Sequence, residues 1–227
     1  MSLIANFLTS SIGRKWIVAL TGLVLVAYVL GHLAGNLQIF WSAERINAYA
    51  VFLHSLGPIL WAIRLFLLAC FVAHIYFTIQ LALENRSARS QQYAEQVPQR
   101  STTASRTMAI SGLIVLCFVI YHLLHFTVQV DPSIIQKDAE GHTNVYNMVI
   151  LGFMSPFATI FYLLGIFLLC MHLSHGFSSF IQTLGLNTRS TARALQVGGT
   201  ALAWLVFAGY ASIPLSVLFG FLQLQTH

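Results

Sequence analysis

The chain has 227 residues, of which 57% are hydrophobic and only 7% are charged. This composition excludes an ordinary soluble domain, in which about a quarter of the residues carry charge. The net charge of +5 is explained by membrane topology and gives no reason to expect a nucleic-acid partner, because the basic residues are divided unevenly between the loops.

Long apolar stretches predict an all-α integral membrane protein, a five-helix transmembrane bundle that forms a single domain over residues 1–227. The predicted spans cover approximately residues 16–40, 59–83, 108–130, 155–184 and 195–222, each long enough to cross roughly 30 Å of hydrocarbon. The fourth apolar run begins at Val149 and exceeds one crossing, and Pro156 predicts a short interfacial turn before the span. Four tryptophans are expected near span ends as interfacial anchors: Trp16, Trp41, Trp61 and Trp204. The sequence gives no evident sustained repeat.

The basic residues predict the orientation in the membrane. If the five helices alternate in direction, eight of the eleven Lys and Arg residues fall on one side: Arg14, Lys15, Arg86, Arg89, Arg100, Arg106, Arg189 and Arg193. Arg45, Arg64 and Lys137 fall on the other side. The positive-inside rule therefore predicts a cytoplasmic N-terminus and an external C-terminus. The polar segment from Glu84 to Arg106 is either a solvated cytoplasmic loop or a docking surface for a soluble partner.

Six of the nine histidines lie within the apolar stretches, in chain order His32, His74, His122, His125, His172 and His175. An ionisable side chain at bilayer depth costs several kcal/mol unless it is paired or ligated, so these residues indicate function. Counted from the charged helix ends, His32 and His122 lie about 24 to 27 Å along their helices, and His74 and His172 about 15 to 18 Å. The sequence therefore predicts two levels of facing histidines, offset by roughly 9 Å.

Four histidines at two matched depths indicate two stacked bis-histidine haems. Imidazole is a good iron ligand, and helix bundles hold cofactors between facing helices. Gly31, Gly35 and Gly176 near these histidines would leave room for a flat macrocycle. No CxxCH motif occurs, so the haems would be bound without a covalent link. Zinc fits less well because no carboxylate lies near these histidines.

Several alternatives remain open at this point. Residues three apart share a helix face, so spacing does not choose between His122 and His125, or between His172 and His175. The remaining histidines would contact a propionate, a quinone or a neighbouring helix. A single membrane histidine is more often a hydrogen-bonding residue than a ligand, and a haem-free anchor or a transporter is one alternative function. A cytochrome b subunit of a hydrogenase or formate dehydrogenase is another.

Several motifs resemble a known family. They are SIGRKWIVALTGL leading to GHLAGN, then INAYAVFLHSLGP, AHIYF, and HLSHGF followed by GLNTRS. Together they resemble the membrane cytochrome b subunit of succinate:quinone oxidoreductases, of the single-chain, five-helix, di-haem type. The resemblance spans nearly the whole chain.

The resemblance implies one axial haem ligand on each of the first four helices: His32, His74, His122 and His172. His74 and His172 would hold the haem nearer the dehydrogenase subunits, and His32 and His122 the distal one. It implies two haem b groups, and a quinone, expected to be menaquinone, as the substrate.

The resemblance also implies the setting of the subunit. Its partners would be the flavoprotein and iron–sulfur subunits of respiratory complex II, on the cytoplasmic face of a bacterial inner membrane, and it would contact lipid and quinone. The chain would react with quinone, whereas the dicarboxylate chemistry would belong to the partners, because the sequence contains neither a flavin fold nor cluster cysteines. No catalytic residue is predicted.

The quinone site departs from the family pattern. Some relatives use an acidic residue near the outer start of the second helix in quinol chemistry, whereas this region offers no carboxylate beyond Glu44. Polar residues gather there instead, and we expect quinone contacts at His54, Ser55 and Arg64.

Overall fold

The computed structural model describes residues 7, 10–87, 103–138, 140–185, 188 and 191–225. Within them, five helices are long and apolar enough to cross a membrane, which confirms the predicted all-α five-helix fold. They are α2 (Ser11–Asn36), α4 (Pro58–Ser87), α5 (Thr103–His122), α7 (Pro156–Thr183) and α8 (Ala192–Leu218). Residues 88–102, which form most of the polar segment considered as a docking surface, lie outside the described part.

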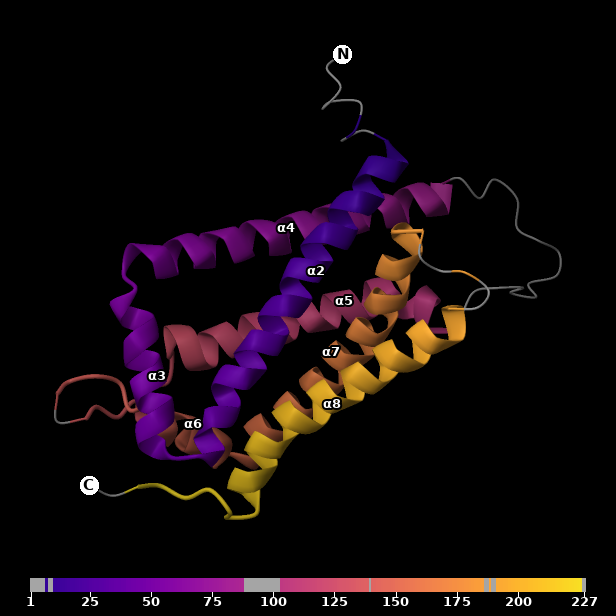
Figure 1. The fold of residues 1–227 in the computed structure, drawn as a ribbon. Helices are drawn as coiled ribbons and strands as arrows, with labels where there is room; N and C mark the ends of the chain where they lie inside the picture. Colours follow the sequence, from indigo (N-terminus) through magenta and orange to yellow (C-terminus); the bar gives the residue numbers. More distant parts are fainter. Residues whose placement is uncertain are drawn as a thin grey trace.

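Three antiparallel packing contacts dominate among the long helices, and that of α7 with α8 is the most extensive. α2 packs against α4, α5 packs against α7, α2 also contacts α7, and α8 lies along α7. The start of α2 and the end of α8 lie at opposite ends of the bundle (Figure 1). α5 and α7 approach each other closely at Gly165, where a Cβ atom would lie 2.2 Å from the ring of Phe118. This arrangement brings the histidine-bearing helices α2, α4, α5 and α7 together.

Two short helices, α3 (Ala43–Ser55) and α6 (Val145–Phe153), lie together at the end of the bundle where α2 ends (Figure 1). Asn47 of α3 joins them, because its amide donates to Asn144 Oδ1 at 3.1 Å and its Oδ1 accepts from the Tyr146 backbone N–H at 2.9 Å. Buried apolar side chains of both helices belong to one core cluster. A 3₁₀ turn, η1 (Leu37–Phe40), leads from α2 toward α3, and a second, η3 (Pro132–Ile134), precedes α6.

The fourth apolar run is divided as predicted. α6 ends at Phe153, and Pro156 is the first residue of α7, a position where its missing N–H costs nothing. The Ser155 hydroxyl accepts a hydrogen bond from the Ala158 backbone N–H at 3.4 Å, which caps the helix.

The prediction for Trp204 is wrong. This residue lies in the middle of α8 rather than near an end, with its ring centroid 5.6 Å from that of Phe207 and 6.2 Å from that of Phe167. α8 begins at Ala192 and ends at Leu218, so twelve residues precede Trp204 in the helix. The indole therefore lies beside Phe167 of α7 and Phe207 of α8 and stays half exposed in the middle of the span, away from either helix end.

Candidate functional site

His74 and His172 form what we call the middle pair, because both lie near the middle of their helices, α4 and α7. The Nδ1 atom of His74 lies 3.1 Å from the Val18 carbonyl oxygen and 3.3 Å from the Thr21 hydroxyl, both on α2. A carbonyl oxygen only accepts, so this pattern assigns the ring proton to Nδ1. The Nε2 atom of His74 consequently keeps its lone pair, the form in which imidazole binds a metal ion.

His172 is held in the same manner by the other helix pair. Its Nδ1 atom lies 3.1 Å from the Ser111 hydroxyl of α5, and that hydroxyl donates its own proton to the Met108 carbonyl at 3.0 Å. Ser111 therefore accepts from Nδ1–H, and Nε2 of His172 is also left with its lone pair. His172 lies within electrostatic range of His74.

A glycine follows each of these two hydroxyl residues. A Cβ atom at Gly22 would lie 3.1 Å from Cε1 of His74, which is tighter than ordinary contact. A Cβ atom at Gly112 would lie 3.5 Å from Cε1 of His172, at ordinary contact distance. Each imidazole of the middle pair thus lies against a glycine on the neighbouring helix.

His32 and His122 form what we call the end pair, because they lie near the C-terminal ends of α2 and α5. Their ring centroids are 5.8 Å apart. Metal–imidazole bonds are about 2 Å long, so two imidazoles on opposite sides of one metal ion have centroids roughly 6 Å apart. Tyr28 stacks on His32 at 5.5 Å, and the Phe118 ring lies 6.3 Å from His122. The two side chains therefore fit a bis-histidine site.

His125 shares the surroundings of His122. α5 continues directly into a π-helix, η2 (Leu123–Val128), which contains His125, and such segments are frequent at functional sites. The Nδ1 atoms of His122 and His125 lie 3.3 and 3.2 Å from the same Tyr162 hydroxyl of α7. Both histidines that the sequence leaves open thus face one buried tyrosine.

An ionised carboxylate lies beyond His125, outside the membrane-spanning segments. Hydrogen bonds from Ser133 lower the pKa of Asp131, and the charge of His125 contributes in the same direction. Asp131 Oδ1 accepts from the Ser133 backbone N–H at 2.9 Å. Asp131 thus interacts electrostatically with His125, whereas the imidazoles of the middle pair contact hydroxyl groups.

His175 differs from His172 in its contacts. Over the described part of the chain, its imidazole makes no hydrogen bond, whereas that of His172 reaches Ser111 on α5. His172, and not His175, therefore contacts a hydroxyl group of a neighbouring helix through Nδ1, as His74 does with Thr21 of α2.

The two levels are further apart than the sequence predicts. Thr21, which contacts His74, and His32 are eleven residues apart on α2, and the same spacing separates Ser111 from His122 on α5. Eleven residues correspond to about 16 Å of helix, compared with the roughly 9 Å predicted. Counting from charged residues gives the wrong value because these do not mark one common depth.

The glycines expected to admit a macrocycle differ in role. A Cβ atom at Gly31 or Gly176 would have no atom within 4 Å, so both face open space. At Gly35, however, a Cβ atom would lie 2.8 Å from the Tyr49 ring of α3. Gly35 therefore permits the packing of α3 on α2, which corrects the interpretation from sequence.

The residues expected to contact quinone are only partly brought together. A pocket of about 450 Å³ is lined by His54 and Ser55 of α3 and by residues 141–143 and Val145. His54 Nδ1 donates to the Ala50 carbonyl at 2.8 Å, which leaves Nε2 available. Arg64 does not line this pocket, and its guanidinium lies 5.2 Å from the Trp61 ring centroid.

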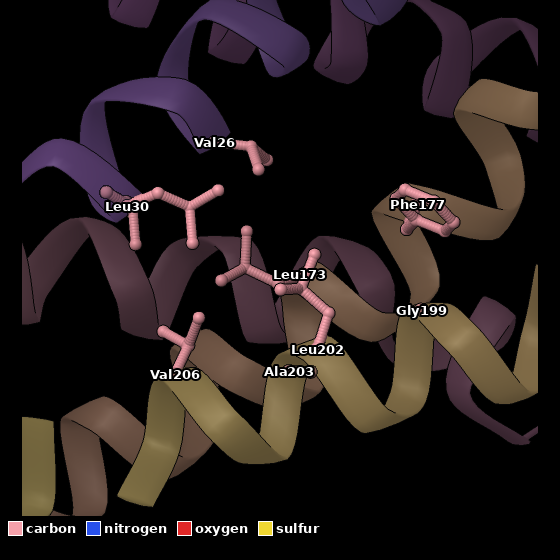
Figure 2. Close-up of a pocket in the computed structure, with 9 residues that line it drawn as sticks. Val26, Leu30, Leu173, Phe177, Gly199, Leu202, Ala203 and Val206 are labelled. Carbon is pink, nitrogen blue, oxygen red and sulfur yellow. The ribbon is translucent and has the colours of Figure 1, made fainter. Parts of the chain in front are cut away.

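A second cavity lies between α2, α7 and α8 (Figure 2). Its volume is about 20 Å³, and aliphatic side chains together with Phe177 surround it. Space of that size holds one water molecule at most, and the lining offers no side chain that could bind a metal ion. This cavity is a packing gap between helices.

Sequence reasoning did not identify the hydroxyl groups that hold the histidines. Thr21, Ser111 and Tyr162 stand inside apolar stretches, where a hydroxyl is ordinarily a helix-packing residue. A signal for two of them is present in the sequence, because segment 21–32 (TGLVLVAYVLGH) resembles segment 111–122 (SGLIVLCFVIYH). This likeness is confined to twelve residues, so it is a local similarity and not a sustained repeat.

The fold defines a class of protein, a multi-span helical membrane protein whose bundle carries pairs of histidines on neighbouring helices. A family model described as the succinate dehydrogenase/fumarate reductase transmembrane subunit matches residues 84–210. This match covers more than half of the chain, so the chain belongs to that family and is a multi-pass membrane subunit of such a complex. No curated protein and no solved structure matches it significantly.

The family match includes α5, α7 and most of α8. His122 and His172 lie within the matched residues, whereas His32 and His74 lie before them. Roles for the first two helices therefore depend on the geometry described above.

Proposed function

We propose that this chain carries electrons through two b-type haems between an iron–sulfur subunit and membrane quinone, as the di-haem, single-chain anchor of a succinate:quinone oxidoreductase. The observation that carries the proposal is the middle pair, in which each imidazole donates from Nδ1 and leaves Nε2 free. Ligating histidines are ordinarily held in this manner by a hydrogen bond from the other ring nitrogen.

The proposed axial ligands are His74 with His172 for one haem and His32 with His122 for the other. The first pair is supported by its hydrogen bonds to α2 and α5, and the second by the 5.8 Å separation of its rings. When bound, each haem would supply a one-electron carrier. The protein would supply the ligands, their orientation and an apolar surrounding that excludes water.

The proposed partners are the flavoprotein and iron–sulfur subunits, attached at the bundle end where α2 begins. Arg14 lies at this end, where it donates to Gln80 at 3.1 Å and forms an ion pair with Glu84. Lys15 and Arg193 also lie near this end in sequence. The positive-inside rule favours the cytoplasmic side of a bacterial inner membrane for it, and the external side for the end of α8.

The proposed quinone site is the pocket lined by His54 and Ser55, with menaquinone as the substrate. Because Nδ1 donates to the Ala50 carbonyl, the Nε2 atom of His54 would accept a hydrogen bond from a quinol hydroxyl group, and the apolar lining residues Val51 and Val145 would contact the ring. Residues of α3 line the pocket, α3 lies at the bundle end where α2 ends (Figure 1), and His32 lies near that end of α2 and contacts His122. Electrons would therefore pass from the middle pair to the end pair before they reach quinone.

The main test is purification of the whole complex in mild detergent, followed by a pyridine haemochrome assay and subunit identification. We expect two non-covalent haems per chain, with flavoprotein and iron–sulfur subunits present. A folded complex without haem, even after incubation with haemin, would overturn the electron-transfer proposal and favour an anchor or transporter function.

The quinone site has a separate test. The double variant His54→Ala/Ser55→Ala should lower quinone reductase activity about 10-fold or more and leave both haems in place, because it removes the polar groups that orient the ring. Arg64→Ala is the matched control and should have the smaller effect. Equal activities for the double variant and the unmodified complex would exclude this pocket.

A further inference from the structure

The helices α2 and α5 carry the same arrangement of four side chains. In each helix a hydroxyl residue and a glycine stand together, an aromatic residue follows seven positions after the hydroxyl, and a histidine follows four positions later. In α2 these are Thr21, Gly22, Tyr28 and His32; in α5 they are Ser111, Gly112, Phe118 and His122. The intervening positions are apolar in both segments, and Leu and Val recur at matching places.

The equivalent residues also make equivalent contacts. Thr21 lies 3.3 Å from Nδ1 of His74 on α4, and Ser111 lies 3.1 Å from Nδ1 of His172 on α7. Each aromatic residue lies beside the histidine of its own helix. The similarity between the two segments thus extends from the sequence to the contacts across the bundle.

Both hydroxyl groups are set up to accept a hydrogen bond. Thr21 Oγ1 donates to the Ile17 carbonyl at 2.7 Å, and Ser111 Oγ donates to the Met108 carbonyl at 3.0 Å. A hydroxyl has one proton, so neither group has a second proton to offer to the imidazole. The proton between each hydroxyl and its histidine therefore belongs to the histidine ring.

We propose that Thr21 and Ser111 are paired positioning residues, which hold the two imidazoles of the middle pair through Nδ1–H, so that Nε2 of each would be available to ligate one shared haem iron. This inference rests on the proposed function, since it assumes that the middle pair ligates haem. The hydrogen bond would increase the electron donation of each imidazole, which favours ferric iron and lowers the reduction potential of that haem.

Thr21 and Ser111 differ in whether the histidine that each contacts has a second hydrogen-bond acceptor. The Nδ1–H group of His74 also reaches the Val18 carbonyl at 3.1 Å, so it keeps an acceptor when Thr21 is replaced. Within the described residues, His172 has only the Ser111 hydroxyl. Loss of Ser111 should therefore have a larger effect than loss of Thr21.

The experiment compares Ser111→Ala and Thr21→Val in the complete purified complex. Haem content, the electron paramagnetic resonance of the ferric haems and a redox titration are measured for each haem. We expect Ser111→Ala to retain both haems and to raise the potential of the middle haem alone. Replacing such outer partners changes metal binding by about 10- to 100-fold, and a tenfold change in the ferric-to-ferrous preference is about 59 mV for one electron. Thr21→Val should shift the same haem by less.

Ser111→Thr and Thr21→Ser keep the hydroxyl and should restore both the potential and the resonance signal. Ser212→Ala on α8 is the matched control, because the Ser212 hydroxyl donates only to the Gly209 carbonyl of its own helix, at 2.7 Å. If Ser111→Ala impairs assembly, Ser111→Cys, which keeps a weaker acceptor, replaces it and should give a shift in the same direction.

The possible failures are distinguishable. Two haems with unchanged potentials and signals in Ser111→Ala would overturn the positioning role and leave the proposed function intact. Shifts of equal size in both haems, or in Ser212→Ala, would also overturn it. A haem-free unmodified complex would instead remove the proposed function itself.

Discussion

The middle pair comes from α4 and α7 and the end pair from α2 and α5, and the two pairs have different neighbours. His74 and His172 lie against glycines and donate to hydroxyl groups of α2 and α5. His32 and His122 lie among the aromatic rings of Tyr28, Phe118 and other residues. Hydrogen bonds that fix the ring proton leave one choice of metal-binding nitrogen, whereas ring packing fixes position without choosing a nitrogen.

Tyr162 makes the contrast sharper. Its single proton can be donated to only one of His122 and His125, so at least one of these histidines donates from Nδ1 to the Tyr162 oxygen. The end pair therefore has two histidines for one position, and the middle pair has one. We therefore expect a substitution of His74 or His172 to change the haem content directly. At the other level, the effect of a substitution will depend on whether His122 or His125 is the ligand.

The largest effect is expected from replacing a ligand of the middle pair. His172→Ala should reduce the haem content from two per chain to one, because one axial ligand is lost, and the remaining haem should keep its spectrum. A haemochrome assay on the purified complex measures this. His175→Ala is the control and should retain both haems; the opposite result would assign the ligand to His175.

Comparison of His122→Ala with His125→Ala should show which of these two histidines ligates the end haem together with His32. We expect His122→Ala to remove the end haem, because its ring lies 5.8 Å from His32, and His125→Ala to retain two haems. Redox titration identifies which haem remains. Loss of the end haem in His125→Ala alone would show that the π-helix supplies the ligand.

An intermediate effect is expected at the glycine beneath His74. In Gly22→Ala the new Cβ atom would lie 3.1 Å from the imidazole, and overpacking of this kind costs about 1 to 3 kcal/mol. The midpoint temperature for loss of the middle-haem absorbance should fall. Gly198→Ala, which meets no atom within 4 Å, is the control and should not lower the midpoint temperature. Equal effects of the two variants would argue against close packing at Gly22.

The smallest effect is expected from Tyr162→Phe. It removes the hydroxyl group that contacts both His122 and His125. A hydrogen bond contributes about 1 kcal/mol, or roughly fivefold in an equilibrium constant. The reduction potential of the end haem should shift by the equivalent of about 1 kcal/mol, while the reduction potential of the middle haem stays unchanged. A shift confined to the middle haem would contradict the division into two pairs.

The membrane spans and the turn at Pro156 could be predicted from the sequence because hydropathy and proline geometry act locally. Helix geometry also predicted that histidines on different helices would face each other, and the structure brings His32 and His122 together. The π-helix after His122 could not be predicted, since no local residue preference specifies it. The spacing of the levels was underestimated because charged residues do not mark equal depths.

The hydroxyl partners required knowledge of which helices are neighbours. Thr21 and His74 are 53 residues apart, and Ser111 and His172 are 61 apart. Nothing in the local sequence of either residue indicates such a contact. The similarity of segments 21–32 and 111–122 is a usable signal, but it becomes meaningful only when both segments are placed beside the helices they contact.

The eleven-residue interval between Thr21 and His32, repeated between Ser111 and His122, corresponds to slightly more than three full turns of about 3.6 residues each. One side of each helix thus carries a residue at each of the two histidine levels, and the helix fixes the distance between the levels. A single inserted residue would rotate His32 by about 100° away from that side. We therefore expect this interval to tolerate substitutions but not insertions or deletions of one residue.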